Sequence, residues 1–197
     1  MCFSGNRPEV SKSDSRGLNR IQPVDTDNAT GEIKRLLAEI RAKFGLVPNL
    51  FRVLANAPTA LEAYLNFTAT LGGGTLDARV QEQIGLTVAE SNLCDYCLNA
   101  HAFIGGGIGL TQTEIVDAVH ANAADGKIDA ILKLARSIVV QRGEITDADL
   151  QNARNSSLTD CEILETVANV VLNIFMNYLD HVARPRIDFP MVKQNKG

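Results

Sequence analysis

The stretch Glu82-Gln-Ile-Gly-Leu-Thr-Val-Ala-Glu-Ser-Asn-Leu-Cys-Asp-Tyr-Cys-Leu-Asn-Ala-His101 concentrates more reactive side chains than any other part of the chain. Two of the four cysteines and one of the three histidines fall at the spacing Cys94-x2-Cys97-x3-His101, and Glu82 and Glu90 precede them. This spacing is compatible with a thiol redox site, a metal site or a pair of inert core cysteines. The local structure decides which of these residues can meet.

This stretch is predicted to form two helices joined by a reversal near residues 92–93. Apolar residues recur at helical spacing on two sides of the segment from about 76 to 92, which is typical of a buried helix, and Thr75 is its expected N-cap. A second helix is expected to begin between residues 92 and 94, with Asn92 as its cap. It should run to about Ile108, weakened by the glycines at 105–107.

The reversal brings an acidic residue to the second helix. In an antiparallel hairpin, residues at similar distances from the turn face each other, so Glu82 is expected to meet His101, whereas Glu90 lies nearer Cys94. Glu82 falls on an apolar side of its helix, where a carboxylate without a partner would be desolvated. The competing interpretation is that its head group reaches water or an arginine.

The four residues Glu82, Cys94, Cys97 and His101 together predict a thiol redox site. Cys97 and His101 lie one helical turn apart, and a helix N-terminus and a nearby imidazole both lower the pKa of a thiol. A carboxylate bonded to the imidazole would fix its tautomer and stabilise its charged form. Cys94, also one turn from Cys97, could then attack an oxidised Cys97 and close a disulfide, which suits peroxide reduction or disulfide exchange.

Two other interpretations of the cysteine pair stay open. Structural zinc needs a fourth ligand, and the remaining candidates do not fall at a recognisable zinc-finger spacing: Glu82, Glu90, Cys161, His120 and His181. Inert cysteines are often simply buried in a core. Thiol redox chemistry is favoured over both, and neither a metal nor a cofactor is predicted.

Composition places the chain among ordinary globular proteins. It has 197 residues, 45% of them hydrophobic and 21% charged, which is enough for one domain with a substantial core. A net charge of −4 with no basic cluster argues against a nucleic-acid partner. No membrane span or secretory signal is visible, so the cysteines are expected to be reduced thiols in a cytoplasmic protein.

The whole chain is predicted to be all-α. Residues 1–22 are expected to be a flexible N-terminal arm, 23–184 a single all-α domain with the redox motif in 76–108, and 185–197 a loose C-terminal tail. Strand-type alternation is absent. Besides the two central helices, helical spacing or caps predict helices at about 33–44, 48–55, 58–71, 110–123 and 127–142, a short one capped by Thr146, and a long one from Thr159 to about 182.

Two further patterns lie outside the central stretch. Residues 110–119 match residues 158–167, which indicates an internal helical repeat or merely two similar helix starts. Asn169, Asn173 and Asn177 form a ladder along the final helix. These asparagines are expected to bond neighbouring helices or a subunit interface, the alternative being that one of them approaches the thiols.

The pattern Glu82-x11-Cys94-Asp-Tyr-Cys97-x3-His101, followed by a glycine-broken helix and Gly109-Leu-Thr, resembles the alkyl hydroperoxidase D–like, carboxymuconolactone decarboxylase superfamily. It is most similar to the peroxidase-related branch. The likeness is strong over about residues 61–123 and continues more weakly through the final helix.

The resemblance implies an alkyl hydroperoxidase D–like helical bundle that assembles as a homo-oligomer, as trimers, hexamers or dimers. It also implies a thiol-dependent peroxidase in which Cys97 attacks the peroxide, Cys94 resolves, and Glu82 and His101 relay protons. Electrons would come from a thiol reductant such as a lipoylated or thioredoxin-like protein. Tyr96 stands where alkyl hydroperoxidase D has a second histidine, so Tyr96 and Glu90 are auxiliary candidates.

Less favoured functions also follow from these residues. A redox-sensing or disulfide-exchange protein would use the same thiols without peroxidase turnover. A metal-binding helical protein would use them as ligands. A decarboxylase is disfavoured, because decarboxylase members of the superfamily lack the cysteine pair.

Overall fold

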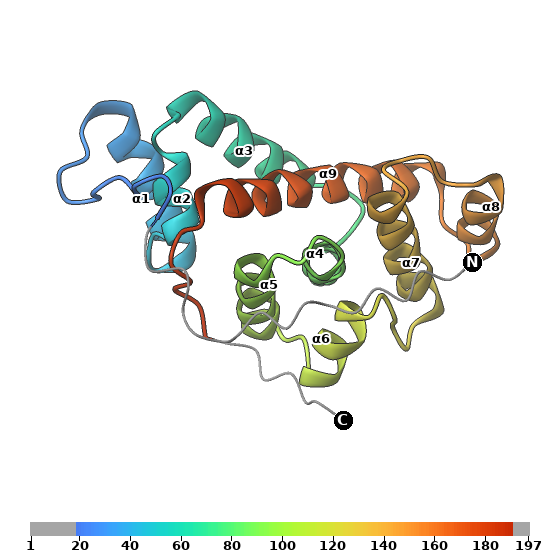
Figure 1. Ribbon diagram of the computed structural model, residues 1–197. Helices are drawn as coiled ribbons and strands as arrows, with labels where there is room; N and C mark the ends of the chain where they lie inside the picture. The colour runs from blue at the N-terminus through green and yellow to red at the C-terminus, as the bar shows by residue number, and fades with distance from the viewer. Residues whose placement is uncertain (1–18, 191–197) are drawn as a thin grey trace.

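The computed structural model describes residues 19–190, and over this range every regular element is a helix (Figure 1). The predicted all-α fold is therefore confirmed. The described helices are α1 (Gly31–Phe44), α2 (Asn49–Leu54), α3 (Pro58–Leu71), α4 (Ala78–Ser91), α5 (Asp95–Gly107), α6 (Gln112–Val119), α7 (Gly126–Val140), α8 (Asp147–Asn155) and α9 (Asp160–Ala183).

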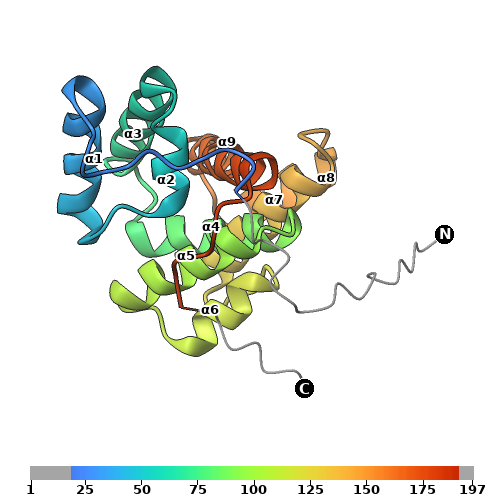
Figure 2. The same cartoon turned by 60° about the vertical axis from the view of Figure 1, so that its left-hand side comes forward.

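Helix α4 lies at the centre of the fold and packs against α5, α6, α7 and α9. Figure 1 shows it end-on beneath α9, with α5 and α6 below it and α7 and α8 at one end of the molecule. Helices α1, α2 and α3 gather at the other end (Figure 2). Ile84, Leu86 and Val88 on α4 are all 0% exposed, as expected for a helix that is apolar on two sides.

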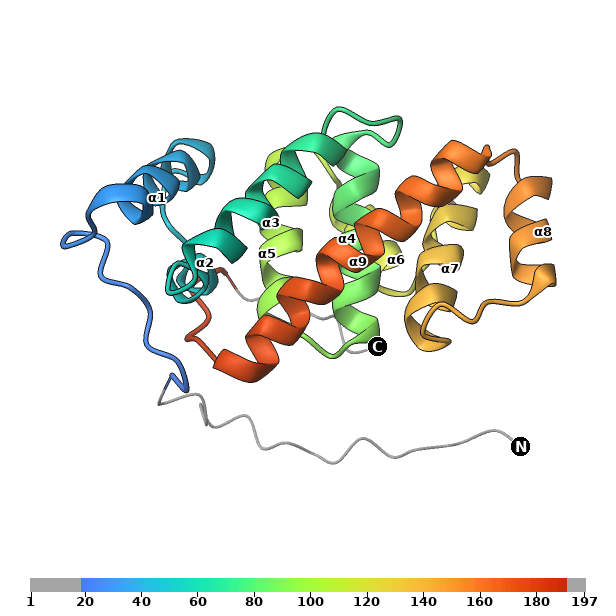
Figure 3. The ribbon, with the colours of Figure 1, turned by 90° about the horizontal axis from the view of Figure 1, so that it is seen from above.

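Helix α9 covers this core along most of its length. Seen from above, it runs beside α3 and crosses over α4 (Figure 3). With 24 residues it extends for about 36 Å at the usual helical rise. Whatever side chains α9 turns inward therefore lie over the α4–α5 hairpin.

The caps of the two central helices differ from those expected from the sequence. Asp77, not Thr75, caps α4, because its carboxylate accepts a hydrogen bond from Val80 N. Cys94, not Asn92, caps α5, and its sulfur accepts from Cys97 N. The side chain of Asn92 instead donates a hydrogen bond to Asn177 of α9.

Two helices end earlier than the sequence pattern indicates. Helix α6 ends at Val119 instead of about 123, and α7 at Val140 instead of 142. Ala121 and Arg142 adopt left-handed backbone conformations, with φ of 58° and 56°. Such conformations end a helix, and neither residue type predicts them.

The similarity between residues 110–119 and 158–167 corresponds to a shared helix start. Thr111 with Glu114 and Thr159 with Glu162 both form complete capping boxes. The helices that follow have 8 and 24 residues, so the similarity does not extend to helices of equal length.

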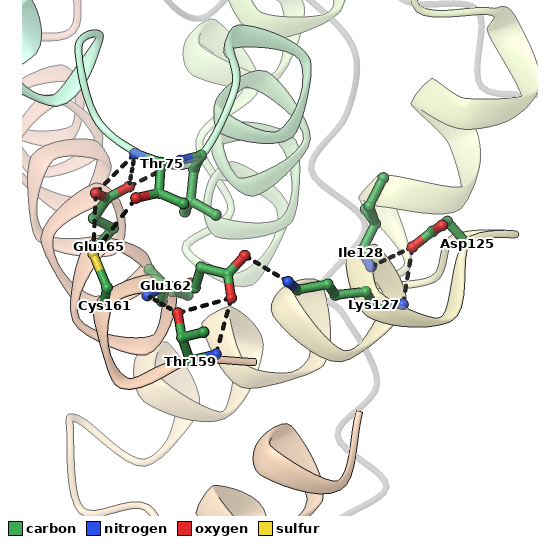
Figure 4. Close-up of polar contacts among 10 residues, drawn as sticks. Thr75, Asp125, Lys127, Ile128, Thr159, Cys161, Glu162 and Glu165 are labelled. Carbon is green, nitrogen blue, oxygen red and sulfur yellow. Dashed lines mark hydrogen bonds and ion pairs between the residues drawn. The ribbon is translucent and has the colours of Figure 1, made fainter. Parts of the chain in front are cut away.

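A polar cluster fixes the position of the first half of α9 (Figure 4). The Glu165 carboxylate accepts hydrogen bonds from the backbone N–H groups of Thr75 and Leu76, at 2.8 and 2.9 Å, in the turn before α4. Glu162 pairs with Lys127 of α7 at 2.7 Å. These contacts tie α9 to both α4 and α7, and so set which of its side chains face inward.

The described ends of the chain pack against the domain. Arg20 N donates to Ala183 O at 2.8 Å, and the Asp188 carboxylate accepts from Tyr96 Oη at 2.7 Å and from Asn49 N at 2.8 Å. Hydrogen bonds thus hold residues 19–22 and 185–190 against the domain, and the flexible arm and loose tail stay predictions. The rest of the arm and tail, residues 1–18 and 191–197, lies outside the described residues.

Among residues 19–190, the helices are too short or too polar to cross a lipid bilayer.

Candidate thiol site

The chain reverses between α4 and α5 at the predicted position. Leu93 adopts a left-handed conformation with φ of 57°, and Cys94 N then donates to Ala89 O at 2.9 Å, closing the turn. Helices α4 and α5 consequently run back along each other as an antiparallel pair.

The predicted meeting of Glu82 and His101 is present in this hairpin. The Nδ1 atom of His101 lies 2.7 Å from Oε2 of Glu82, and both side chains are about one-fifth exposed. Gly85, one turn after Glu82, makes this approach feasible. A Cβ atom at position 85 would lie 2.5 Å from two atoms of the His101 ring.

The surroundings of His101 favour its charged form. Burial lowers the pKa of the imidazole, but the charge of Glu82, its hydrogen bond and the nearby Cys97 together raise that pKa above its ordinary value. The side chain of Asn173, from α9, adds a hydrogen bond in the same direction. With Nδ1 held by the carboxylate, Nε2 is the nitrogen that remains for Asn173 and for proton exchange with a thiol.

The two cysteines lie at the N-terminus of α5 as free thiols. Cys94 is 1% exposed and Cys97 is 4% exposed. The Cys94 sulfur accepts a hydrogen bond from Cys97 N at 3.3 Å and donates one to Oδ2 of Asp180 at 3.5 Å. The interaction with Cys97, burial and the charge of Asp180 raise the pKa of the Cys94 thiol above its ordinary range.

A polar row on α9 covers the thiols and the imidazole. We call it the inner face of α9, and it consists of Glu162, Thr166, Asn169, Asn173, Asn177 and Asp180, all buried. Asn173 bonds His101, Asn177 accepts from Asn92 at 2.9 Å, and Asp180 bonds Cys94. One member of the predicted asparagine ladder thus does approach the site.

The two auxiliary candidates have different surroundings. Tyr96 points away from the imidazole, because its hydroxyl donates to Asp188 at 2.7 Å and accepts from Leu50 N at 3.1 Å. It anchors residues 185–190 and the start of α2. Glu90 is half-buried near the end of α4, and its auxiliary role stays a prediction.

The structure adds two residues that the sequence did not indicate. Asp180 lies 86 residues from Cys94 in the chain, and Tyr64 comes from α3. Burial chiefly, and also the negative charges of Cys97 and Glu82, raise the pKa of the Tyr64 phenol, and its ring stacks on Phe175 of α9 at 5.9 Å. Neither residue has a local spacing that could reveal it, because both contacts arise only when distant helices pack.

The set of residues able to hold a metal differs from the one considered from the sequence. Within the described part of the chain, Cys94, Asp180 and His181 place one ligand atom each within 4.8 Å of one another. Cys97 and His101 are not part of this group. Three ligands of these types suit a zinc ion, and a fourth position would need water or a substrate.

A separate apolar cavity of about 580 Å³ lies on another side of α5. Phe44, Phe103, Gly106, Leu110 and Ile115 are among the residues that line it, and Glu82, Cys94, Cys97 and His101 are not. The thiols are therefore enclosed by helices, and this cavity does not reach them.

Comparison with known proteins connects this geometry to a family. Residues 57–139 match the model of the carboxymuconolactone decarboxylase family, and this range contains α3 to α6 and the whole thiol hairpin. The alkyl hydroperoxide reductase Rv2159c of Mycobacterium tuberculosis is 30% identical over 97 residues, which are 49% of this chain and 28% of the relative. The chain thus spans less than a third of that relative.

Solved structures share the fold over most of the chain. An uncharacterized peroxidase-related protein from Ralstonia eutropha JMP134, described as an alkylhydroperoxidase AhpD core, superposes with a TM-score of 0.77 at 22% identity. The match covers 86% of this chain and 92% of that one. The debrominase Bmp8 superposes with a TM-score of 0.74 at 13% identity, covering 86% and 92%. At these identities the likeness shows the fold.

Proposed function

We propose that this chain, which belongs to the alkyl hydroperoxidase D–like, carboxymuconolactone decarboxylase superfamily, reduces hydroperoxides through the thiol of Cys97. The observation that carries the proposal is the 2.7 Å contact between Glu82 and His101, one helical turn after Cys97. A partly buried carboxylate bonded to an imidazole, one helical turn from a thiol, is the arrangement that general-base activation of a nucleophile requires.

The first half of the cycle oxidises Cys97. His101 accepts the thiol proton, and Glu82 stabilises the imidazolium that results. The Cys97 thiolate attacks the terminal oxygen of the hydroperoxide, and the O–O bond breaks. The leaving alkoxide takes the proton from His101 and departs as an alcohol, so that Cys97 becomes a sulfenic acid.

The second half of the cycle closes a disulfide. Cys94, one turn away at the helix N-terminus, attacks the sulfur of Cys97, and the S–O bond breaks. The hydroxyl group leaves as water with the proton that the Cys94 thiol gives up. An external dithiol, of the lipoylated or thioredoxin-like class, then reduces the disulfide and restores both thiols.

The enclosure of the thiols suits this chemistry. Cys97 is 4% exposed, so bulk water and other thiols reach its sulfenic acid slowly, whereas Cys94 is in place to react with it. The same enclosure favours small hydroperoxides over large ones, unless the helices above the site move apart.

The test is multiple-turnover consumption of an organic hydroperoxide with a small dithiol as reductant. Wild-type protein should consume many equivalents, and Cys97→Ser should lose this activity. Cys161→Ser is the matched control, because Cys161 is an exposed thiol on α9 and should not be needed. The proposal fails if Cys97→Ser keeps the wild-type rate.

A redox sensor is the second candidate, favoured by the burial of both thiols. A sensor would form the disulfide between Cys94 and Cys97 once for each oxidant molecule and turn over slowly with any reductant. The same assay separates the two functions, because a sensor gives a single equivalent of peroxide consumption followed by a plateau. The cytoplasmic location stays a prediction.

A further inference from the structure

The Cys94 thiol has a carboxylate partner of its own, distinct from the one that serves Cys97. Asp180 lies on the inner face of α9, is 2% exposed, and accepts the Cys94 S–H at 3.5 Å. The relay of Glu82 and His101 comes instead from α4 and α5. The carboxylate beside Cys94 and the carboxylate of the relay therefore come from different elements, α9 and α4.

We propose that Asp180 is the general base that takes the proton from Cys94 when Cys94 closes the disulfide. This role rests on the proposed function, since it concerns the step after Cys97 has become a sulfenic acid. The Cys94 sulfur forms a bond to the Cys97 sulfur as its proton passes to Oδ2 of Asp180. The S–O bond of Cys97 breaks, and the hydroxyl group leaves as water after Asp180 passes on the proton that it received, which returns the carboxylate to its ionised form.

The surroundings of Cys94 explain why a base in direct contact is needed. The interaction with Cys97, burial and the charge of Asp180 keep this thiol protonated, and a protonated thiol is a poor nucleophile. The carboxylate lies where the thiol already points its hydrogen. On the other side, the N–H of Cys97 at 3.3 Å and the N-terminus of α5 stabilise the negative charge that develops on sulfur.

Helix α9 holds Asp180 in place, because this residue belongs to the buried inner face of the helix. The side chain projects from the same row as Asn173 and Asn177, which bond His101 and Asn92. A carboxylate buried to this extent costs several kcal/mol in solvation unless it has polar partners. Because the packed row holds Asp180 beside Cys94, the carboxylate is placed to accept the proton at each turnover.

The experiment is a single turnover of reduced protein with one equivalent of hydroperoxide, quenched at increasing times. A dimedone-type probe traps the Cys97 sulfenic acid, and mass mapping measures the disulfide between Cys94 and Cys97. In Asp180→Asn, sulfenic acid should form within twofold of the wild-type rate, while disulfide closure slows by about 100-fold, the usual share of a general base. Cys94→Ser should give a sulfenic acid that persists.

Matched variants separate this role from a structural one. Asp160→Asn removes a carboxylate from the first turn of the same helix, where the side chain is 76% exposed, and should close the disulfide at the wild-type rate. Asp180→Glu keeps a carboxylate and should recover part of the closure rate. Circular dichroism and thermal unfolding show whether each variant is folded.

A second measurement does not depend on peroxide. Cys97 is loaded with thionitrobenzoate as a mixed disulfide, and attack by Cys94 releases the coloured thiolate while Asp180 takes the proton. This release should also slow in Asp180→Asn. If wild-type protein forms no sulfenic acid, the proposed peroxidase fails, yet this release still tests Asp180.

Three results would overturn the role of Asp180. Closure at the wild-type rate in folded Asp180→Asn would exclude it as a base. Equal slowing of sulfenic acid formation and closure would indicate a general disturbance of the site. One equivalent of metal in reduced protein purified without chelator, lost in both Asp180→Asn and His181→Gln, would make the carboxylate a metal ligand.

Discussion

Gly85 lies one helical turn after Glu82 on α4, directly against the ring of His101. An alanine in the middle of a helix is normally more favourable than a glycine by about 1 kcal/mol. Here a Cβ atom would come within 2.5 Å of two ring atoms, closer than van der Waals contact allows. The glycine is therefore explained by the approach of two helices and not by a turn.

Gly85→Ala should displace the imidazole from Glu82 and Cys97. A shift of about 1 Å in a catalytic group can cost about 100-fold in rate, so hydroperoxide reduction should fall by that order. Overpacking should also cost about 1–3 kcal/mol of folding stability, which offsets the gain in helix propensity. Steady-state peroxide consumption and urea unfolding measure the two effects.

Gly106→Ala is the control for this substitution. Gly106 lies in α5, and a Cβ atom there would meet nothing within 4 Å. This variant should keep its activity and should not lose stability. Equal activity of the two alanine variants would show that His101 does not need its present position.

The pair formed by Glu82 and His101 also makes stability depend on pH. The pKa of His101 is raised in the folded protein, so the folded state binds its proton more tightly than the unfolded chain. The stabilisation is complete below the ordinary histidine pKa of about 6.5 and is lost as the pH rises through the higher pKa of the folded state.

Glu82→Gln should therefore be most destabilising at mildly acidic pH. A hydrogen bond to a charged group contributes about 1.5–3 kcal/mol, and this part of the difference from wild type should shrink as the pH becomes alkaline. Urea unfolding across this range measures it. Glu39→Gln, at an exposed pair with Arg35, is the control and should change stability little. If the loss of stability in Glu82→Gln grew with pH, the pair of Glu82 and His101 would not be its cause.

At this scale the sequence is informative where the contact is local. Glu82, Cys94, Cys97 and His101 lie within one hairpin, so helical period and a single turn are enough to place Glu82 beside His101. Asp180 and Tyr64 come from helices whose packing the sequence does not reveal. The role of Gly85 is likewise not visible in the sequence, because it depends on a side chain of the neighbouring helix.

Among the elements, α5 connects the thiols to α2 and to residues 185–190 through Tyr96. The hydroxyl of Tyr96 joins Leu50 N at the start of α2 to the carboxylate of Asp188, and its ring meets Phe189 edge-on at 5.7 Å. Residues 185–190 are thereby fastened to the helix that bears both cysteines. The sequence of residues 185–190 does not indicate this contact, because the partner Tyr96 lies about 90 residues away in the chain.

Tyr96→Phe should weaken this junction without altering the relay. The buried N–H of Leu50 loses its acceptor, which costs about 1–3 kcal/mol, and residues 185–190 should become more open to proteolysis. Chemical unfolding and limited proteolysis measure these effects. Tyr178→Phe is the matched control and should change neither, because it removes only a hydroxyl from a side chain that is 56% exposed and keeps the apolar ring.

The activity of Tyr96→Phe separates two roles for this residue. If Tyr96 only anchors residues 185–190, the variant should reduce hydroperoxide within a few-fold of wild type at temperatures where it is folded. A loss of about 100-fold in a fully folded variant would instead indicate an auxiliary role in proton transfer.

Across the whole molecule, the polarity of α9 is inverted relative to an ordinary surface helix. Its inner face is polar and bonds the thiol site, whereas its exposed side is apolar. We call this side the outer face of α9, and it consists of Leu164, Val167, Val171, Phe175, Tyr178 and Val182, which are 36–67% exposed. An apolar stripe of this length on a surface helix is typical of an interface.

We propose that a second copy of the chain covers the outer face of α9. Six side chains that each expose about 100 Å² would bury about 1,200 Å² in total when two copies meet, which reaches the lower end of stable interfaces. The stripe itself contains no charged residue, so two identical faces would not repel each other. A symmetric contact uses the same side chains of both copies. Helix α9 would then be buried on both faces, by the core of its own chain and by the second copy.

Val171→Lys tests this arrangement, because Val171 lies in the middle of the outer face and is 51% exposed. In a symmetric pair the substitution places two unpaired charges in an apolar contact, so the mass measured by light scattering should fall to that of one chain. Val140→Lys is the control: this valine is 66% exposed but lies on α7, and the assembly should survive its change.

The effect of Val171→Lys should extend to the thiol site, because the inner face of the same helix carries Asp180 and Asn173 against Cys94 and His101. A dissociated Val171→Lys should therefore expose α9 to hydrogen exchange and slow disulfide closure. A wild-type protein that stays a single chain at tens of micromolar would refute the pairing and leave the outer face for a different partner.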